Sequence, residues 1–354
     1  RSREFREMTL SPLNYFQTLA GEFGRGWNRF WFAPSDPLTL GLLRIASGLM
    51  AFYLVASYSP DLERYFGSNG LVPLEMVRGL EAQTRDGDRQ VLPGQVREAM
   101  PREYRFSYLD YFHTPGGLRT VHACGLLTLA LFTCGLFTRL TGIASLVVVL
   151  SYLHRGPMLT SQVEPILAFV LFYLCLGPAG AACSLDRRWA ARREGLPVPA
   201  SSLASPWATV SLRLIQVHLT VVYLMMAVGK LGGNIWWSGL AMWFLIARSE
   251  QRMVDLTALS SLPLLVHAGS YAVMFWQAAF PILIWNRLAR PLLLGINALM
   301  WALLAPVIGN IPLAVMMVVA SLAFVPGDVL RKVTAGPAGR SGDYQAALKA
   351  NAAA

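Results

Sequence analysis

The chain has little charge for its length. Charged residues make up 14% of its 354 residues, hydrophobic residues make up 55%, and the mean hydropathy is +0.45. A soluble globular chain carries about 25% charged residues, so this shortage predicts a polytopic membrane protein. The net charge is +10, but the Arg residues occur in short clusters between apolar runs, as in the cytoplasmic loops of membrane proteins. We therefore expect contact with the lipid bilayer and no nucleic-acid partner.

Cysteine and the common motifs of enzymes are also scarce or missing. The four Cys residues lie in apolar stretches, and none has the CxxC spacing of a metal or redox site. No GxGxxG, P-loop, HExxH or GxSxG motif is present, so the chemistry that these motifs support has no residues to use. These absences predict no metal site and no soluble domain.

Long apolar runs dominate the rest of the chain. A spanning helix needs about 20 mainly apolar residues, and eight segments approach that length. A ninth, Trp236–Arg248, is short and is either a tilted half-helix or a re-entrant segment. The sequence therefore predicts an all-α, polytopic membrane helix bundle of eight or nine spans. The eight clear segments are Leu38–Ser57, Arg119–Phe137, Thr141–His154, Val163–Cys183, Thr209–Leu231, Pro263–Trp285, Pro291–Val307 and Ile311–Val325.

Three regions follow from this pattern. Residues 1–37 form an N-terminal amphipathic, interfacial segment with a helix over Leu10–Phe32. Residues 38–325 form the transmembrane bundle, with an outer loop at 58–118, and residues 326–354 form a flexible tail rich in Gly, Ala and Ser. Arg clusters before the first span and between the fourth and fifth place the N-terminus in the cytoplasm and Lys230 at the outer face.

Lysine is the rarest basic residue, with three Lys among the 30 Lys and Arg residues. Lys230 is the only one before the last few dozen residues. Desolvation can make an amine neutral and basic, which a guanidinium does not allow. Tyr223 lies two helical turns before Lys230, with Met226 between them, so this stripe and the nearby Trp236 suit an apolar pocket for a quinone ring. The alternative is that Lys230 extends to the interface beside Trp236.

Polar side chains inside the apolar segments are the remaining candidates. A charged side chain costs about 2.5–3.5 kcal/mol at the centre of a membrane helix on insertion scales, so such residues usually face a bundle interior or a cavity. Arg44 is expected to bond carbonyl groups or to pair with Glu164, unless Glu164 carries protons. Gly41 and Gly48 are expected to permit close helix contact near Arg44. The intramembrane polar candidates are Arg44, Glu164, Arg213, Gln216, His218 and Gln277.

Several motifs, in order, resemble one family. The most specific is VVYLMMAVGKLGGNIWWSGLAM, which is similar to a segment of the vitamin K-dependent gamma-carboxylases and of the bacterial horizontally transferred transmembrane domain proteins. In that segment a Tyr-led helix ends in Lys-Leu, followed by Trp and Gly. The other similar stretches are LRIASGLMAFYL with DLERYFGSNGLVP, GPAGAACSLDRR, and IWNRLARPLLLGINALMWALL before IGNIPLAVMM. The resemblance covers about Leu38 to Val325.

The resemblance implies a specific chemistry. In that family the Lys at the position of Lys230 is proposed to deprotonate vitamin K hydroquinone. Oxygenation of the hydroquinone then yields a strong base that abstracts a glutamyl γ-proton, so that carbon dioxide can add. Carried over, Lys230 is the base, Tyr223 is a wall of the cofactor pocket with Met226 and Trp236, and a menaquinone or vitamin K-type quinol is the cofactor in a bacterial inner membrane.

The chain also departs from the carboxylases. It reads TSQVEPIL where the animal enzyme has a functional His, Gln277 stands where an acid is common, and Leu299 and Met300 lie where another His occurs. The large extracytoplasmic domain of the carboxylases is not expected here either. These departures favour a structural or accessory subunit of a membrane assembly, with protein partners, that holds a lipid or a quinone. A quinol-dependent enzyme using Lys230 and a lipid or quinone carrier without turnover remain open.

Overall fold

The structure is a computed structural model that describes residues 12–71, 73, 75, 106–112, 114–156, 159–193, 204–249 and 253–334. Within these residues the secondary structure is helical, apart from one isolated bridge between Ser35 and Ser205. The prediction of an all-α chain is therefore confirmed for this part. Most of the predicted outer loop, 58–118, and most of the predicted tail, 326–354, lie outside the described residues, as do residues 1–11.

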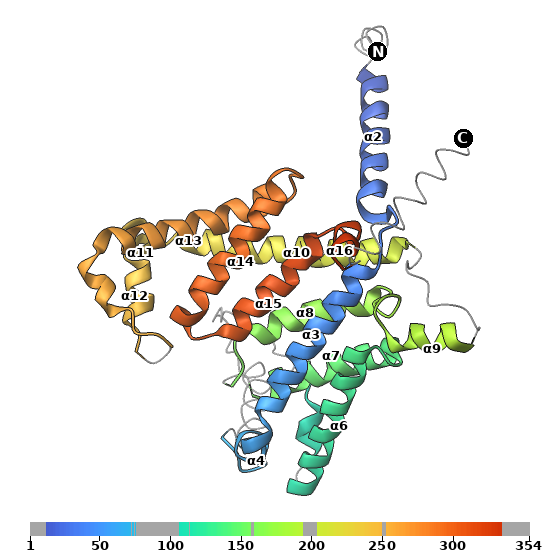
Figure 1. Cartoon of the computed structure of the whole chain (residues 1–354), viewed down its shortest axis with the longest axis vertical. Coiled ribbons are helices and arrows are strands. Elements are labelled where there is room, and N and C mark those ends of the chain that lie inside the picture. Colours follow the sequence, from blue (N-terminus) through green and yellow to red (C-terminus); the bar gives the residue numbers. More distant parts are fainter. Residues whose placement is uncertain are drawn as a thin grey trace, which may run out of the picture.

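The helices form one bundle from which α2 projects (Figure 1). In chain order they are α2 (Pro12–Phe32), α3 (Leu38–Ser57), η1 (Ser59–Asp61), α4 (Leu62–Phe66), η2 (Tyr108–Tyr111), α6 (Pro115–Cys134), α7 (Thr138–Arg155), α8 (Val163–Leu176), α9 (Leu185–Arg193), α10 (Pro206–Leu231), α11 (Asn234–Trp237), α12 (Ala241–Ala247), η3 (Thr257–Ser261), α13 (Pro263–Leu283), α14 (Ala289–Ile308), α15 (Ile311–Ser321), η4 (Leu322–Phe324) and α16 (Gly327–Thr334).

Four helical stretches are long and apolar enough to cross a membrane: Leu38–Phe66, Pro115–Cys134, Pro206–Leu231 and Ala289–Ile308. Two shorter apolar helical stretches, Val163–Leu176 and Ile311–Phe324, accompany them. The higher count of eight or nine spans stays a prediction.

Two predicted segments are interrupted or cut short in the structure. The segment Trp236–Arg248 does not form one helix, because a turn at Gly239, with φ of 74°, separates α11 from α12. The segment Val163–Cys183 is helical only as far as Leu176, since Gly177 and Pro178 follow directly. A Pro disfavours the helical conformation of the residue before it, and this early end leaves a non-helical stretch between α8 and α9.

The core lies where α3, α8, α10, α13 and α15 meet. The helix α3 packs against α6, α8 and α15, and α10 packs against α13 and α8. At Gly48 a Cβ atom would collide with the side chain of Thr133 on α6. The small residue therefore allows α3 and α6 to approach closely, as expected from the sequence.

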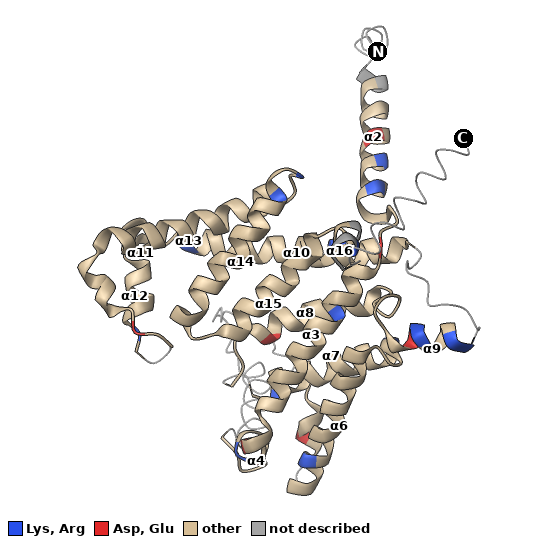
Figure 2. Cartoon of the chain, in the orientation of Figure 1, with Lys and Arg blue, Asp and Glu red and all other residues tan. Residues whose placement is uncertain are grey.

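Charged residues lie mainly at the ends and outside of this bundle (Figure 2). The helix α9 carries five of them, Asp186, Arg187, Arg188, Arg192 and Arg193. The projecting α2 has one exposed apolar side, where Phe16, Phe23 and Trp27 are 65%, 69% and 54% exposed, and its Arg residues lie on the other side. The two sides of α2 thus differ in polarity, and the place of this segment at a membrane interface stays a prediction.

Candidate functional site

Lys230 is the penultimate residue of α10, at the turn that leads to α11. Its Nζ atom lies 4.9 Å from the centre of the Trp236 ring, a cation–π arrangement. The turn is closed by the amide of Gly233, which donates to the Lys230 carbonyl at 3.0 Å. The side chain is half-buried, and within the described part of the chain no carboxylate pairs with it.

Tyr223 lies in the core. Its side chain is 0% exposed and stacks on Phe280 with ring centres 3.9 Å apart. Its hydroxyl donates to Asn297 Oδ1 at 2.5 Å and accepts from Trp301 Nε1 at 2.7 Å. Asn297 in turn donates to Ser321 Oγ at 3.0 Å. The phenol therefore joins α10 to α14, and through Asn297 to α15, with both its donor and acceptor roles used.

The core covers Tyr223, Met226 and Lys230 to different extents. Met226 is partly buried and packs against the core, while Lys230 lies farther along the same face, where the core no longer covers it. None of the three residues, nor Trp236, lines any of three cavities formed by the described residues. The structure therefore brings Lys230 next to Trp236 but leaves Tyr223 and Met226 as packing residues.

Arg44 is fully buried, and of its two expected kinds of partner it bonds carbonyl groups and not the Glu164 carboxylate. Its guanidinium donates to the carbonyls of Ala179 at 2.9 Å and Cys183 at 2.6 Å. These carbonyls belong to the non-helical stretch after α8, whose backbone acceptors are not used by helix bonds. Gly135, with φ of 75°, allows this approach, because a Cβ there would lie 2.7 Å from Arg44 Nη1.

Glu164 lies at the opposite end of α8 from the Arg44 site. Its carboxylate accepts from the Ser161 amide at 2.8 Å and from Ser161 Oγ at 3.1 Å, and Tyr58 Oη lies 3.5 Å away. Ser161 lies just before α8, so these bonds fix the chain where it enters the helix, and a carboxylate in the first turn interacts favourably with the helix N-terminus. Glu164 therefore stabilises the start of α8 in this structure.

His218 and Gln277 are also packing residues. The ring of His218 stacks on Phe169, with ring centres 4.0 Å apart, and its Nδ1 lies 3.0 Å from Tyr173 Oη. This contact joins α10 to α8. Gln277 is 2% exposed in α13, and its Oε1 has no hydrogen-bond partner among the described residues.

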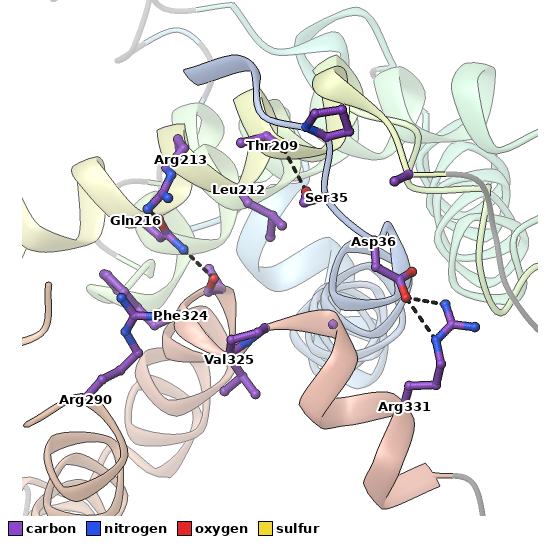
Figure 3. A pocket seen from close by; sticks show the side chains of 15 residues that line it. Ser35, Asp36, Thr209, Leu212, Arg213, Gln216, Arg290, Phe324, Val325 and Arg331 are labelled. Carbon is purple, nitrogen blue, oxygen red and sulfur yellow. Dashed lines mark hydrogen bonds and ion pairs between the residues drawn. The ribbon is translucent and has the colours of Figure 1, made fainter. Parts of the chain in front are cut away.

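Arg213 and Gln216 line a cavity at the other end of α10 from Lys230 (Figure 3). The cavity has a volume of about 540 Å³ and lies between the linker before α3, α10, the start of α14 and the turn from η4 to α16. Gln216 Nε2 donates to the Ala323 carbonyl at 2.6 Å, and Gln216 Oε1 accepts from Arg213 Nη1 at 2.9 Å. The amide thus fixes the guanidinium and ties α10 to η4.

Backbone and side-chain bonds hold the walls of this cavity together. Ser35 and Ser205 exchange backbone hydrogen bonds of 3.3 and 3.0 Å. Thr209 Oγ1 donates to the Ala33 carbonyl and lies 2.9 Å from Ser35 Oγ. Thr39 Oγ1 donates to the Val325 carbonyl at 3.2 Å. Segments that are far apart in sequence therefore meet in a fixed arrangement at this end of the bundle.

Arg290, also in this cavity, has no local motif that would separate it from the other Arg residues near helix ends. The available signal is its position immediately before Pro291, where a predicted span begins; with eight spans this start is on the same predicted side as Arg213. Asn297 and Trp301 lie inside the following helix, and nothing in their sequence spacing points to Tyr223.

The chain matches no family model, no curated protein and no solved structure. The resemblance to the carboxylase-like family therefore depends on the sequence motifs alone and stays a prediction.

Proposed function

We propose that this chain is a membrane-embedded helical protein that acts as a structural or accessory subunit, in which Lys230 is an interfacial anchor. Embedding in lipid is supported by the four candidate spans, which expose much apolar surface. Within the most apolar stretch of 18 residues in α10, 28% is buried inside the protein. Leu224, Met225 and Val228 are among the exposed side chains of this helix. Either lipid or a protein partner would cover this surface.

The observation that carries the proposal is the separation of Lys230 from Tyr223. A base for quinol chemistry needs the ring of its substrate within hydrogen-bond reach. The Tyr223 hydroxyl is instead used by Asn297 and Trp301, and Lys230 contacts the Trp236 ring. A Lys that keeps its alkyl stem on apolar surface and its amine over an indole is typical of a membrane boundary.

Substitution of Lys230 by Arg distinguishes a role of this residue as an interfacial anchor from a role as a catalytic base. A guanidinium keeps the charge and stacks well on an indole, but it does not act as a base near neutral pH. We therefore expect Lys230→Arg to purify from the membrane with the same protein partners and thermal stability as the parent chain. Lys230→Met should lose about 0.5–1 kcal/mol of stability, the size of an exposed cation–π contact. Arg248→Met, which removes an exposed cation after α12, is the matched control.

The same preparation tests the partner and the quinone. Mass spectrometry of the complex in mild detergent should show stoichiometric protein partners, unchanged in Lys230→Arg. A quinone in equal amount to the chain that is lost in both Lys230 variants would contradict the anchor and support the alternative, a quinol-dependent membrane enzyme with Lys230 as its base. The observation that favours this alternative is that the half-buried amine has no carboxylate partner in the described ranges.

A further inference from the structure

The cavity at the start of α10 carries an excess of positive charge. Three Arg residues line it, Arg213, Arg290 and Arg331, together with one carboxylate, Asp36. Asp36 forms an ion pair with Arg331, with Arg331 Nε 3.0 Å from Asp36 Oδ2, and its Oδ1 accepts from the Leu38 amide at 3.0 Å. The carboxylate is thus already occupied, and no described carboxylate pairs with Arg213 or Arg290.

Both of these guanidinium groups are held in place by neutral acceptors. Arg213 donates from Nε to the Phe30 carbonyl at 3.1 Å and from Nη1 to Gln216, and it lies over the Phe30 ring with Cζ 4.4 Å from the ring centre. Arg290 donates from Nε to the Ile284 carbonyl at 3.2 Å and from Nη2 to the Trp285 carbonyl at 3.5 Å.

Spare donors remain on both groups. A guanidinium has five N–H donors. Each guanidinium uses two of its five donors on these acceptors, which leaves three donors in each group with no partner among the described residues. The two groups come from different helices, α10 and α14, and both line the same cavity (Figure 3). Two fixed like charges in one half-buried cavity favour a multivalent anion that accepts from both.

We propose that this cavity binds a phosphate group through Arg213 and Arg290. The planar fork of a guanidinium matches the oxygen atoms of a phosphate, and two such forks match a group with several acceptor oxygens. Leu212 and Phe324 supply apolar surface beside the guanidinium groups, which suits the first carbons of a phospholipid next to its headgroup. The cavity lies at the helix ends that the Arg clusters place at the cytoplasmic side, where anionic lipids are abundant.

An anionic phospholipid and free phosphate share this chemistry, and one titration distinguishes them. The purified full chain in a neutral detergent is titrated with dioctanoyl phosphatidylglycerol, dioctanoyl phosphatidylcholine and inorganic phosphate, with binding followed by thermophoresis. We expect phosphatidylglycerol to bind about tenfold more tightly than phosphatidylcholine, because only the first has a net negative headgroup. Competition by inorganic phosphate would make soluble phosphate a ligand as well, and failure to compete would assign the site to lipid.

Substitutions test the residues. Arg213→Gln and Arg290→Gln should each weaken phosphatidylglycerol binding about fivefold, the effect of one Arg near a lipid surface. Arg287→Gln is the matched control, since Arg287 is an exposed cation three residues before Arg290 and does not line the cavity. Equal affinity for the two lipids, or equal effects of Arg287→Gln and Arg290→Gln, would overturn the proposal.

A folding check keeps this test decisive. Arg213 also holds the end of α2 through Phe30, so Arg213→Gln has a structural effect that thermal unfolding will report. Arg213→Lys keeps the charge but not the planar fork, so it should bind more tightly than Arg213→Gln and less tightly than the parent chain. Arg290→Gln tests the site from the other helix. The inference does not depend on the role proposed for Lys230, which lies at the opposite end of α10.

Discussion

Tyr223→Phe tests whether this phenol is a core residue or part of a ligand pocket. The substitution removes one oxygen atom and keeps the ring on Phe280. It removes two hydrogen bonds between helices, to Asn297 Oδ1 and from Trp301 Nε1. Interhelical hydrogen bonds in membrane proteins contribute on average about 0.6 kcal/mol and at most about 1.7. Because both partners are buried at 2% exposure or less and would be left without the bond, we expect a loss of about 1–3 kcal/mol.

The assay is thermal unfolding of the detergent-purified chain, with Tyr53→Phe as the control. Tyr53 lies on α3 and is 58% exposed, so its hydroxyl should contribute within about 0.5 kcal/mol. Trp301→Phe should produce part of the same loss, and the double variant should lose less than the sum of the two, because the bond they share is removed once. A Tyr223→Phe protein as stable as Tyr53→Phe, but depleted of a bound quinone, would refute the reasoning and restore a pocket.

Three further predictions follow from other contacts. Gly135→Ala should cost at least about 2 kcal/mol in thermal unfolding, because φ is 75° and the new Cβ meets Arg44 Nη1 at 2.7 Å; Gly295→Ala, with open space around it, should be neutral or stabilising. Arg44→Met should lower the stability by about 3 kcal/mol by leaving two carbonyls unpaired. Its effect should add to that of Glu164→Gln within about 0.5 kcal/mol. A strongly non-additive double variant would instead indicate an ion pair between the two residues. Burial acts to raise the pKa of Asp186, but hydrogen bonds from Thr138 and Phe137 outweigh it and lower the pKa below 3.8. The parent chain should therefore be more stable than Asp186→Asn by a full amount above pH 3.8 and by less below it. A difference in stability that does not change with pH would contradict this.

The positions of most helices could be predicted because apolar runs and Pro residues mark them. The predicted segment Leu38–Ser57 has the bounds of α3, and Pro206 begins α10 three residues before the predicted Thr209. Pro fits the first turn of a helix, where its missing amide costs nothing. At Gly177 a Gly-Pro pair ends the helix, and the predicted segment is too long there, because hydropathy does not report where the backbone hydrogen bonds of a helix end.

The Arg44 site shows why partners were harder to predict than helices. Charge alone pairs Arg44 with Glu164, since both lie in apolar segments. The observed acceptors are carbonyls of Ala179 and Cys183, which are available because α8 ends at Leu176. The end of α8 therefore decides between the two expected kinds of partner for Arg44, and the predicted segment Val163–Cys183 does not give that end. The hydrogen bonds of Tyr223 to Asn297 and Trp301 could not be predicted from spacing within one helix, since they depend on how α14 packs on α10.

Along α10, the polar side chains differ in whether their hydrogen-bond donors and acceptors are already used within the protein. In the middle of the helix, the Tyr223 hydroxyl has both of its roles filled by neighbouring helices, so the phenol has little left to offer a ligand. At one end, Lys230 is over an indole, which retains a cation without directing its protons to a partner. At the other end, the Arg213 guanidinium is fixed by carbonyl and amide acceptors and still lines a cavity that has a second such group in Arg290. Binding chemistry on this helix is therefore best placed at its beginning, away from the Lys that first stands out in the sequence.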